Sequence, residues 1–359
     1  MAGPTETDIR AAAEAVVRIG RVGGIAAKDG AVQLSLEVEP GRAADAASER
    51  HAVEAALAGL PGVTSATVVL TAERAAPAPA SRPSGGAPGR GAARLELPDV
   101  KAIVAVASGK GGVGKSTVAV NLAVALARQG LAVGLMDSDI YGPSLPRMMG
   151  IVGKPALTDD KMLLPMQKWG VACMSIGFLV AEETAMIWRG PMVMSAVQQL
   201  AGDVAWGPLD ILLIDMPPGT GDAQLTLSQR VPLTGAVIVS TPQDIALLDA
   251  RRGIAMFRKV EVPVLGLIEN MSIFVCPHCG KGTHIFGSGG ARGEAEALGA
   301  PFLGEVPLEL ELRLRCDAGT PAAADDASGQ AFRDIAARLW QEVEARRATG
   351  PAPPRIVME

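Results

Sequence analysis

Gly109-Lys110-Gly111-Gly112-Val113-Gly114-Lys115-Ser116-Thr117 fits the phosphate-loop pattern G-x-x-x-x-G-K-[ST] and carries one lysine more than the pattern requires. In such a loop the glycines let backbone N–H groups converge on anionic oxygens. Lys115 can then reach the outer phosphates, and Ser116 can offer its hydroxyl to Mg²⁺. Residues 101–107 form a short apolar run typical of a buried strand, and residues 116–128 have the apolar spacing of a packed helix. The sequence therefore predicts a nucleotide site at the N-terminus of this helix.

The composition of the 359 residues, 48% of them hydrophobic, is that of a globular protein of about two domains. A formal net charge of −5 provides no basic field for nucleic acid or for an anionic membrane surface, so neither is expected as a partner. The chain has no uninterrupted run of about 18 apolar residues, and its first residues lack the pattern of a signal peptide. Its four cysteines are too unevenly spread for a disulfide framework. We therefore expect a cytoplasmic protein with reduced thiols.

The first 74 residues are expected to form a small α+β accessory domain. Apolar and polar residues alternate over residues 32–39, which is typical of a strand with one covered face. A helical pattern follows at residues 48–60 and a second strand at residues 64–71. Residues 40–48 contain no cysteine, so we expect this domain to serve as a docking or regulatory surface rather than as a metal site.

The remainder divides into a linker, a main domain and a tail. Residues 75–94 are rich in Pro, Gly and Ala without an apolar period, which indicates a flexible linker. Residues 95–345 alternate short β-branched runs with helical stretches, and a tail follows at residues 346–359. This alternation predicts an α/β fold with a doubly wound, mostly parallel sheet of the P-loop NTPase type. The expected strands are residues 103–107, 132–136, 171–176, 211–214, 236–240, 264–268 and 302–306.

Aspartates follow two of the expected strands, at the sheet edge where ligands of such folds bind. Asp137 and Asp139 come after one strand, and Asp215 comes at the end of another. Asp139 could orient the water that attacks the terminal phosphate, while Asp137 and Asp215 would support the Mg²⁺ together with Ser116. A turn-forming role for the first pair is the alternative.

Taken together, four motifs resemble the Mrp/ApbC family of iron–sulfur cluster carriers. They are KGGVGKST, DSDIYGPS, DMPPGTGD and ENMSIFVCPHCG, in that order, and WRGPM, TPQDIALLDARRG and FGSGGAR extend the resemblance over residues 95–345. This family belongs to the deviant Walker A ATPases, which include MinD, ParA and the nitrogenase iron protein. The resemblance implies a homodimer that binds ATP and Mg²⁺, hydrolyses ATP, and passes a labile bridging 4Fe-4S cluster to apo iron–sulfur proteins in concert with assembly scaffold proteins.

The resemblance also assigns roles to individual residues. Lys110 corresponds to the signature lysine that reaches the partner's nucleotide, which makes Lys110, Lys115 and Asp139 the expected catalytic residues. Gly109 to Thr117 would hold the nucleotide, and Asn270, which follows the strand at residues 264–268, would read the adenine. Independently of the family, a positive charge near the outer phosphates stabilises the negative charge of the transition state, and Lys110 could provide it.

Cys276 and Cys279 form a C-x-x-C pair that can present two thiolates to one metal centre. A cubane cluster requires four ligands, so a two-fold dimer could complete the site. Zinc held with His278 or His284, or a redox dithiol, remains an alternative. Cys173 lies in an expected buried strand and should act as a small core residue. Cys316, a further cysteine, has no assigned role.

Two further functions from other classes fit parts of the sequence. A spatial-organising ATPase switch like MinD or ParA would share the loop with two lysines, but the C-terminal PAPPRIVME lacks the basic amphipathic helix that membrane docking needs. A zinc-binding P-loop ATPase would use the same cysteine pair.

Overall fold

The computed structural model describes residues 4–18, 21–28, 31–38, 46–63, 65–72, 95, 97–180 and 190–349. The chain divides into two compact units, residues 1–89 and 90–359, which we describe separately. The predicted linker, residues 75–94, lies outside the described residues, as do Trp188 and Arg189 of the WRGPM motif. None of the described helices is both long and apolar enough to cross a membrane.

The first unit contains two helices and a small sheet. Its elements are α1 (Glu6–Glu14), β1 (Arg21–Lys28), β2 (Ala31–Val38), α2 (Ala46–Ala58) and β3 (Ser65–Ala72). In the sheet, β2 lies between an antiparallel β1 and a parallel β3. The predicted alternation holds, because Val32, Leu34 and Leu36 are buried with Ile9 of α1 and Leu57 of α2. The pattern of RVGGIAAK does not predict β1, whose register shifts next to its two glycines.

The second unit is built on a nine-stranded sheet within the described residues, in the order β11-β10-β9-β4-β8-β5-β7-β6, with β12 also pairing with β10. The strands are β4 (Ile103–Ala107), β5 (Val133–Asp137), β6 (Met166–Lys168), β7 (Val171–Ser175), β8 (Ile211–Asp215), β9 (Gly235–Ser240), β10 (Val264–Val275), β11 (Gly282–Thr283) and β12 (Phe302–Leu308). The ladders are parallel except those of β6 and β11. The predicted mostly parallel sheet is therefore confirmed.

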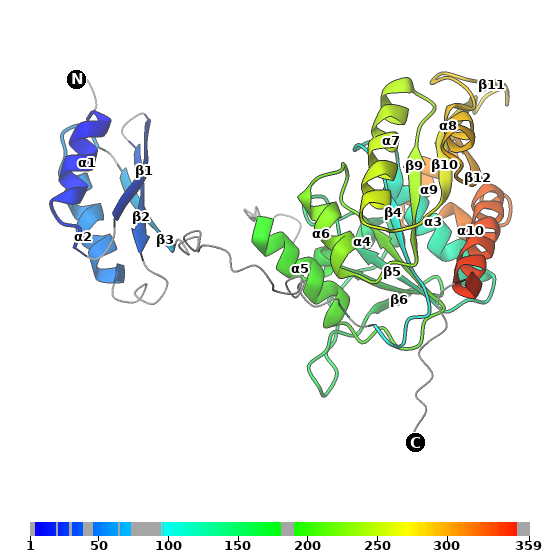
Figure 1. The fold of residues 1–359 in the computed structure, drawn as a ribbon, viewed down its shortest axis with the longest axis horizontal. Helices are drawn as coiled ribbons and strands as arrows, with labels where there is room; N and C mark the ends of the chain where they lie inside the picture. The colour runs from blue at the N-terminus through cyan, green and yellow to red at the C-terminus, as the bar shows by residue number, and fades with distance from the viewer. Residues whose placement is uncertain are drawn as a thin grey trace, which may run out of the picture. The chain divides into compact units, whose positions relative to one another are not determined.

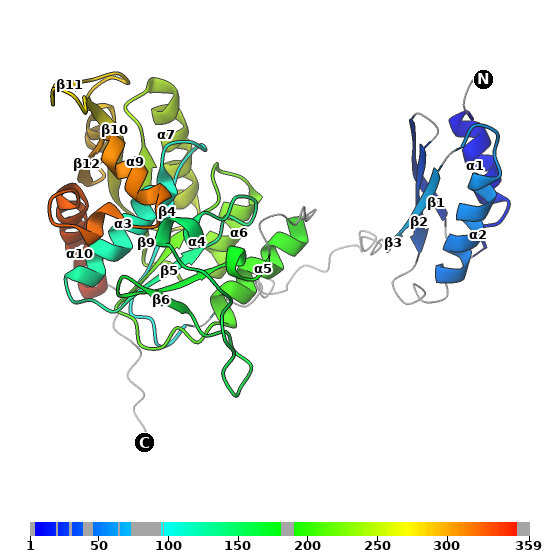
Figure 2. The ribbon, with the colours of Figure 1, turned by 180° about the vertical axis from the view of Figure 1, so that it is seen from behind.

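Helices cover both faces of this sheet. They are α3 (Lys115–Arg128), α4 (Leu145–Met149), α5 (Gly190–Gly202), α6 (Asp222–Arg230), α7 (Asp244–Lys259), α8 (Gly290–Leu298), α9 (Leu310–Asp317) and α10 (Gln330–Thr349), with short 3₁₀ turns η1 (Ile176–Phe178) and η2 (Ala322–Ala324). In Figure 1, α6 and α7 lie in front of the strands, and in the reverse view of Figure 2, α3, α4 and α9 lie in front. The arrangement is doubly wound.

The main departure from the sequence prediction concerns β10. The predicted strand ends at Ile268, but β10 continues to Val275, so Asn270 lies inside the strand and not after it. The extension is stabilised on both sides, because Asn270 pairs with Val306 of β12 and Phe274 pairs with Thr283 of β11. Cys276 therefore follows a strand directly.

Smaller differences affect several other boundaries. β5 ends at Asp137, one residue later than predicted, because Asp137 pairs with Asp215 of β8. β7 ends at Ser175, where η1 begins. The predicted domain end at residue 345 lies inside α10, which continues to Thr349, and residues 350–359 lie outside the described residues.

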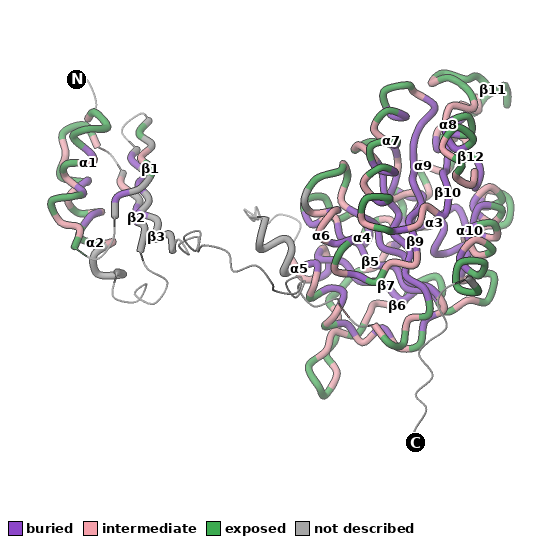
Figure 3. Tube along the Cα trace, in the orientation of Figure 1, coloured by how far each residue is buried: buried purple, intermediate pink, exposed green. Residues whose placement is uncertain are grey.

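The core of the second unit follows the central strands and the buried side of α3, which Figure 3 shows in purple. Leu126 of α3 is completely buried in this core. We expect Leu126→Ala to lower the free energy of unfolding by about 3–5 kcal/mol, because the lost transfer energy adds to that of a cavity. All four tryptophans belong to this unit, so urea unfolding followed by tryptophan fluorescence measures it selectively.

Leu157, which is 60% exposed, provides the matched control. Leu157→Ala should change the free energy of unfolding by about 0.5 kcal/mol or less. Equal losses for the two variants would show that α3 does not carry the core.

Candidate functional site

The phosphate loop connects β4 to α3. At two of its positions close packing leaves room only for glycine. A Cβ atom on Gly109 would lie 2.1 Å from the carbonyl oxygen of Asp249 in α7, and one on Gly114 would lie 2.2 Å from Nδ2 of Asn270. Gly114 also has φ +78°, a left-handed conformation that favours glycine. The backbone of the loop thus sits directly against α7 and β10, and no larger residue fits at either position.

Lys115 forms a buried ion pair with Asp215, the last residue of β8. The two side chains are 6% and 4% exposed, and Nζ of Lys115 also lies 3.4 Å from Oγ of Ser116. Burial raises the pKa of Asp215, and the charge of Lys115 opposes that rise. The structure therefore brings together three of the residues predicted for phosphate and Mg²⁺.

Asp137 lies beside this pair and is held by the protein's own donors. Its carboxylate accepts hydrogen bonds from the backbone N–H groups of Asp139 (3.0 Å) and Leu145 (3.3 Å) and from the hydroxyl of Ser175 (3.1 Å). Burial, and next the negative charge of Asp215, raise the pKa of Asp137 to about 7. Oxygen donors from Asp137, Asp215 and Ser116 are of the kind that Mg²⁺ prefers, so the donor set fits this ion. Asp137 also fixes the start of the loop that carries Asp139.

The other predicted residues of the phosphate site lie at its mouth. Asp139 is half-buried, and its charge contributes to the raised pKa of Asp215, which places it near that carboxylate. Lys110 is half-buried in the loop, and its carbonyl accepts a hydrogen bond from the hydroxyl of Ser108. The backbone N–H of Gly219, in the loop after β8, donates to the carbonyl of Ser108 at 3.2 Å. In this arrangement that donor is occupied by the protein.

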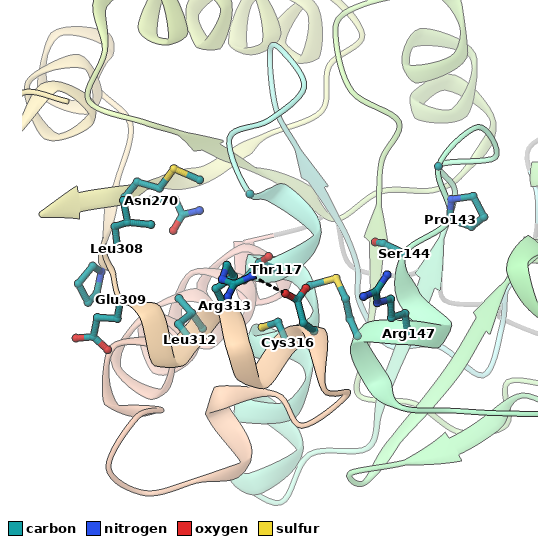
Figure 4. Close-up of a pocket in the computed structure, with 16 residues that line it drawn as sticks. Thr117, Pro143, Ser144, Arg147, Asn270, Leu308, Glu309, Leu312, Arg313 and Cys316 are labelled. Atoms are coloured by element: carbon teal, nitrogen blue, oxygen red, sulfur yellow. Dashed lines mark hydrogen bonds and ion pairs between the residues drawn. The ribbon is translucent and has the colours of Figure 1, made fainter. Parts of the chain in front are cut away.

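A cavity of about 660 Å³ adjoins the phosphate loop and extends over the start of α3. Figure 4 shows Thr117 and Cys316 on its floor, Asn270 at the loop, and Arg147 on the opposite wall. A nucleoside attached to phosphates in the loop would fall in this space. Asn270 lines the cavity, but its Nδ2 donates to the carbonyl of Val113 at 2.8 Å, so its amide supports the loop. Adenine recognition by Asn270 stays a prediction.

Sequence reasoning does not identify the part of the wall that α9 provides. Leu312, Arg313 and Cys316 line the cavity from this helix, and Arg313 forms an ion pair with Asp317 at 3.1 Å. Their position after β12, at the edge of the sheet where ligands bind, is the signal that could have found them. Cys316 is buried, and the amide of Asn121 lies 3.7 Å from its Sγ.

The cysteine pair lies on a tight turn at the end of β10. The N–H of Cys276 donates to the carbonyl of Lys281, and the N–H of Gly280 donates back to the carbonyl of Cys276. Cys276 is half-buried and Cys279 is exposed. Backbone N–H groups of His278 and Cys279, directed at the Cys276 sulfur, lower the pKa of that thiol. The turn therefore stabilises a thiolate at an accessible surface.

The histidines near this pair do not gather around it. Nδ1 of His284 lies 3.1 Å from the carbonyl oxygen of Ser272, and within the part of the chain that the structure describes no three His, Cys, Asp or Glu side chains are grouped to hold a metal ion. One chain thus offers two thiolates here. Cys173, in contrast, is completely buried in β7, which raises its pKa to about 12 and fits the predicted core role.

Comparison with known proteins places these features in a family. The family described as "ParA: NUBPL iron-transfer P-loop NTPase" matches residues 99–340. An Arabidopsis thaliana protein named "Iron-sulfur protein required for NADH dehydrogenase, mitochondrial" is 53% identical over 257 residues, which cover 70% of this chain and 82% of that protein. The iron-sulfur cluster carrier protein of Escherichia coli K12 is 52% identical over 248 residues, 69% of this chain and 67% of its own.

Two solved structures are similar to this chain. A nucleotide-binding protein from Archaeoglobus fulgidus, in complex with ADP, superimposes with a TM-score of 0.57 and 41% identity over 65% of this chain and 93% of that one. The cell division ATPase MinD of Pyrococcus furiosus, at 20% identity and a TM-score of 0.51, shares the fold.

The Lys115–Asp215 pair provides a prediction about stability. Asp215→Asn removes one partner of a buried ion pair, so the nucleotide-free protein should lose about 3–5 kcal/mol of unfolding free energy, measured by urea titration. Asp326→Asn breaks the exposed pair with Arg128, in which Asp326 is 85% exposed, and should cost about 0–1 kcal/mol. A loss for Asp215→Asn as small as that of the control would contradict the buried pairing.

Proposed function

Because the chain belongs to the ParA family of iron-transfer P-loop NTPases described under NUBPL, we propose that it is an ATP-hydrolysing carrier which holds a 4Fe-4S cluster between two copies of itself and passes it to apoproteins. The observation that carries this proposal is a pair of accessible thiols on the turn that directly follows β10, the strand that also contacts the phosphate loop. Asn270 and Cys276 stand at opposite ends of one seven-residue stretch of this chain. A nucleotide site and a metal-ligating pair are thus built on shared elements.

The phosphate loop supports ATP binding through its own residues. Lys115 must leave Asp215 to reach the outer phosphates, and the released carboxylate can then support Mg²⁺ together with Ser116 and Asp137. Bound Mg²⁺ would neutralise charge on the phosphates during transfer to water. Asp139 would orient the attacking water, and Lys110 would reach the nucleotide of a second copy of the chain.

The cluster is cargo in this proposal, and its ligands explain the need for two chains. A cubane cluster takes four thiolates, whereas one chain presents Cys276 and Cys279. A two-fold axis close to the turn supplies the other two. The accessible turn and the lowered pKa of Cys276 favour both the loading and the release of such a cargo.

A surface next to the phosphate loop is suited to pairing with the second copy. Ile245 and Leu248, on the first turns of α7, are 68% and 50% exposed, and the following Asp249 packs against Gly109 of the loop. Ile285, 51% exposed, follows the cysteine turn. A dimer that covers Ile245 and Leu248 would bring Lys110 toward the partner's nucleotide.

The recipients are proposed to be apo iron–sulfur proteins, with scaffold proteins as donors. All four thiols are free, which suits a reducing compartment. The cytoplasm remains our proposed location, although the Arabidopsis thaliana relative is named as mitochondrial.

Anaerobic reconstitution with iron and sulfide tests the cargo. We expect roughly four iron atoms per dimer with the absorption of a cubane cluster, and loss of the bound iron in Cys276→Ser, because only the two Cys279 thiolates of the dimer would remain. Cys173→Ala removes a buried core thiol instead and should keep the iron. Metal analysis that finds zinc and no iron would support the zinc-binding ATPase and overturn the carrier.

The dimer surface gives a separate prediction. Leu248→Glu should weaken ATP-dependent dimerisation by about tenfold or more, since burial of a leucine side chain contributes about 1.5–3 kcal/mol. Sedimentation velocity over a range of protein concentrations measures this change. Leu157→Glu, at an exposed leucine of the segment between α4 and β6, is the matched control and should dimerise normally. Normal dimerisation of Leu248→Glu would exclude α7 from the interface.

A further inference from the structure

Asn270 connects the phosphate loop to the strand that ends at the cysteine pair. Its side chain is 4% exposed, and its Nδ2 donates to the carbonyl of Val113 at 2.8 Å. Gly114, the next residue of the loop, lies so close that a Cβ atom there would meet the same Nδ2 at 2.2 Å. Asn270 therefore follows any displacement of the loop backbone at Val113 and Gly114.

Met271, the next residue, provides a point at which β10 can turn. It has φ +57°, a left-handed conformation that is strained for a residue with a side chain. The register of β10 against β12 is also irregular between Asn270 and Phe274. Met271 lines the nucleotide cavity, so a bound nucleoside would contact the strained residue directly.

Beyond Met271 the chain forms one hydrogen-bonded piece. The hydroxyl of Ser272 donates to the carbonyl of Val306, Phe274 pairs with Thr283, and Val275 pairs with Gly282. The N–H of Cys276 then donates to the carbonyl of Lys281. Because the β10–β11 pairs hold residues 274–283 together, a rotation at Met271 would move the cysteine turn as a unit. The same rotation would change the two links of this segment to β12, the Ser272–Val306 bond and the pairing of Phe274 with Leu308.

The C-terminal end of this segment is hydrogen-bonded next to its N-terminal end. Glu269 is completely buried, and its carboxylate accepts hydrogen bonds from the N–H groups of Gly289 (3.3 Å) and Ala291 (2.7 Å) at the start of α8. Residues 270–288 therefore form a closed hairpin with its base at Glu269. A displacement of this hairpin at its base would leave α8 in place and would act on the contacts of Ser272 and Phe274 with β12.

We infer that Asn270 is a positioning residue that couples nucleotide occupancy to the geometry of Cys276 and Cys279, with Met271 as the pivot. The inference rests on the proposed function for its purpose, since it makes cargo release respond to ATP. The coupling itself does not require a cluster. A phosphate that reorganises the loop at Val113 changes the hydrogen-bond partner of Asn270. The new partner then favours a different position of the hairpin. The coupling runs through contacts within one chain.

The test uses the metal-free, reduced, full-length chain and needs no cluster. Alkylation of Cys276 and Cys279 by iodoacetamide is followed by mass spectrometry without nucleotide, with MgADP and with a non-hydrolysable MgATP analogue. We expect saturating nucleotide to change the alkylation rate of the wild-type pair by threefold or more. In Asn270→Ala the nucleotide-free rate should stay within twofold of the wild type, while the response to nucleotide falls below 1.5-fold.

Nucleotide binding and dimerisation are measured on each variant, because pairing of two copies could itself protect the thiols. A lost response in an Asn270→Ala protein that still binds nucleotide and dimerises supports the coupling. A full response in that protein overturns it, and so does a wild type whose thiols ignore nucleotide. Neither of these results affects the iron content found on reconstitution, so failure of the coupling and failure of the carrier function are distinguishable.

If Asn270→Ala does not bind nucleotide, a second pair of variants tests the coupling. Met271→Gly removes the strain and the side chain at the pivot but keeps the Asn270 contact, and it should reduce the response at least twofold. Met271→Leu keeps a bulky side chain in the left-handed conformation and should respond like the wild type. Equal, full responses in both variants overturn the role of Met271 and the inference with it.

Discussion

The buried ion pair of Lys115 and Asp215 is the interaction on which the site depends. Two charges at this depth are tolerated only when they neutralise each other, and here they join the start of α3 to the end of β8. The parallel pairing of β5 with β8 then sets Asp137 beside Asp215, so that three buried ionisable groups lie together. Phosphate and Mg²⁺ can replace these internal partners charge for charge, which makes the same pair suitable both for stability and for exchange with a ligand.

Much of the second unit can be predicted from its sequence, because its central strands are buried on both faces. Residues 103–107 and 211–214 are apolar throughout, and only a central parallel strand requires this. Elements at the edges escape prediction for the opposite reason. β6 and β11 have three and two residues, and their strand structure comes from antiparallel partners and not from their own pattern. The continuation of β10 depends in the same way on β11 and β12.

Some features of the candidate site can likewise be predicted from the sequence, and others cannot. Gly109, Gly114 and Lys115 of the phosphate loop follow from the motif, since their spacing is set by the chemistry of phosphate. The partners of Asp137, Asn270 and Gly219 do not follow from it, because each is a backbone or hydroxyl group that comes from elsewhere in the fold. The α9 wall of the cavity is also tertiary, as it forms only when β12 delivers that helix to α3 and α4.

The segment from Asn270 to Cys279 is buried at its start and accessible at its end, which bears on how such a protein can carry a cargo. Asn270 is buried and hydrogen-bonded to the loop, whereas Cys276 and Cys279 lie on a turn exposed to solvent. A ligand held only by an exposed turn has few contacts with the fold, so its binding adds little to the stability of one chain. In the carrier function proposed above, the second copy supplies the missing ligands. The phosphate loop differs from the cysteine turn in this respect, because Val113 and Lys115 anchor the loop in the core of the second unit.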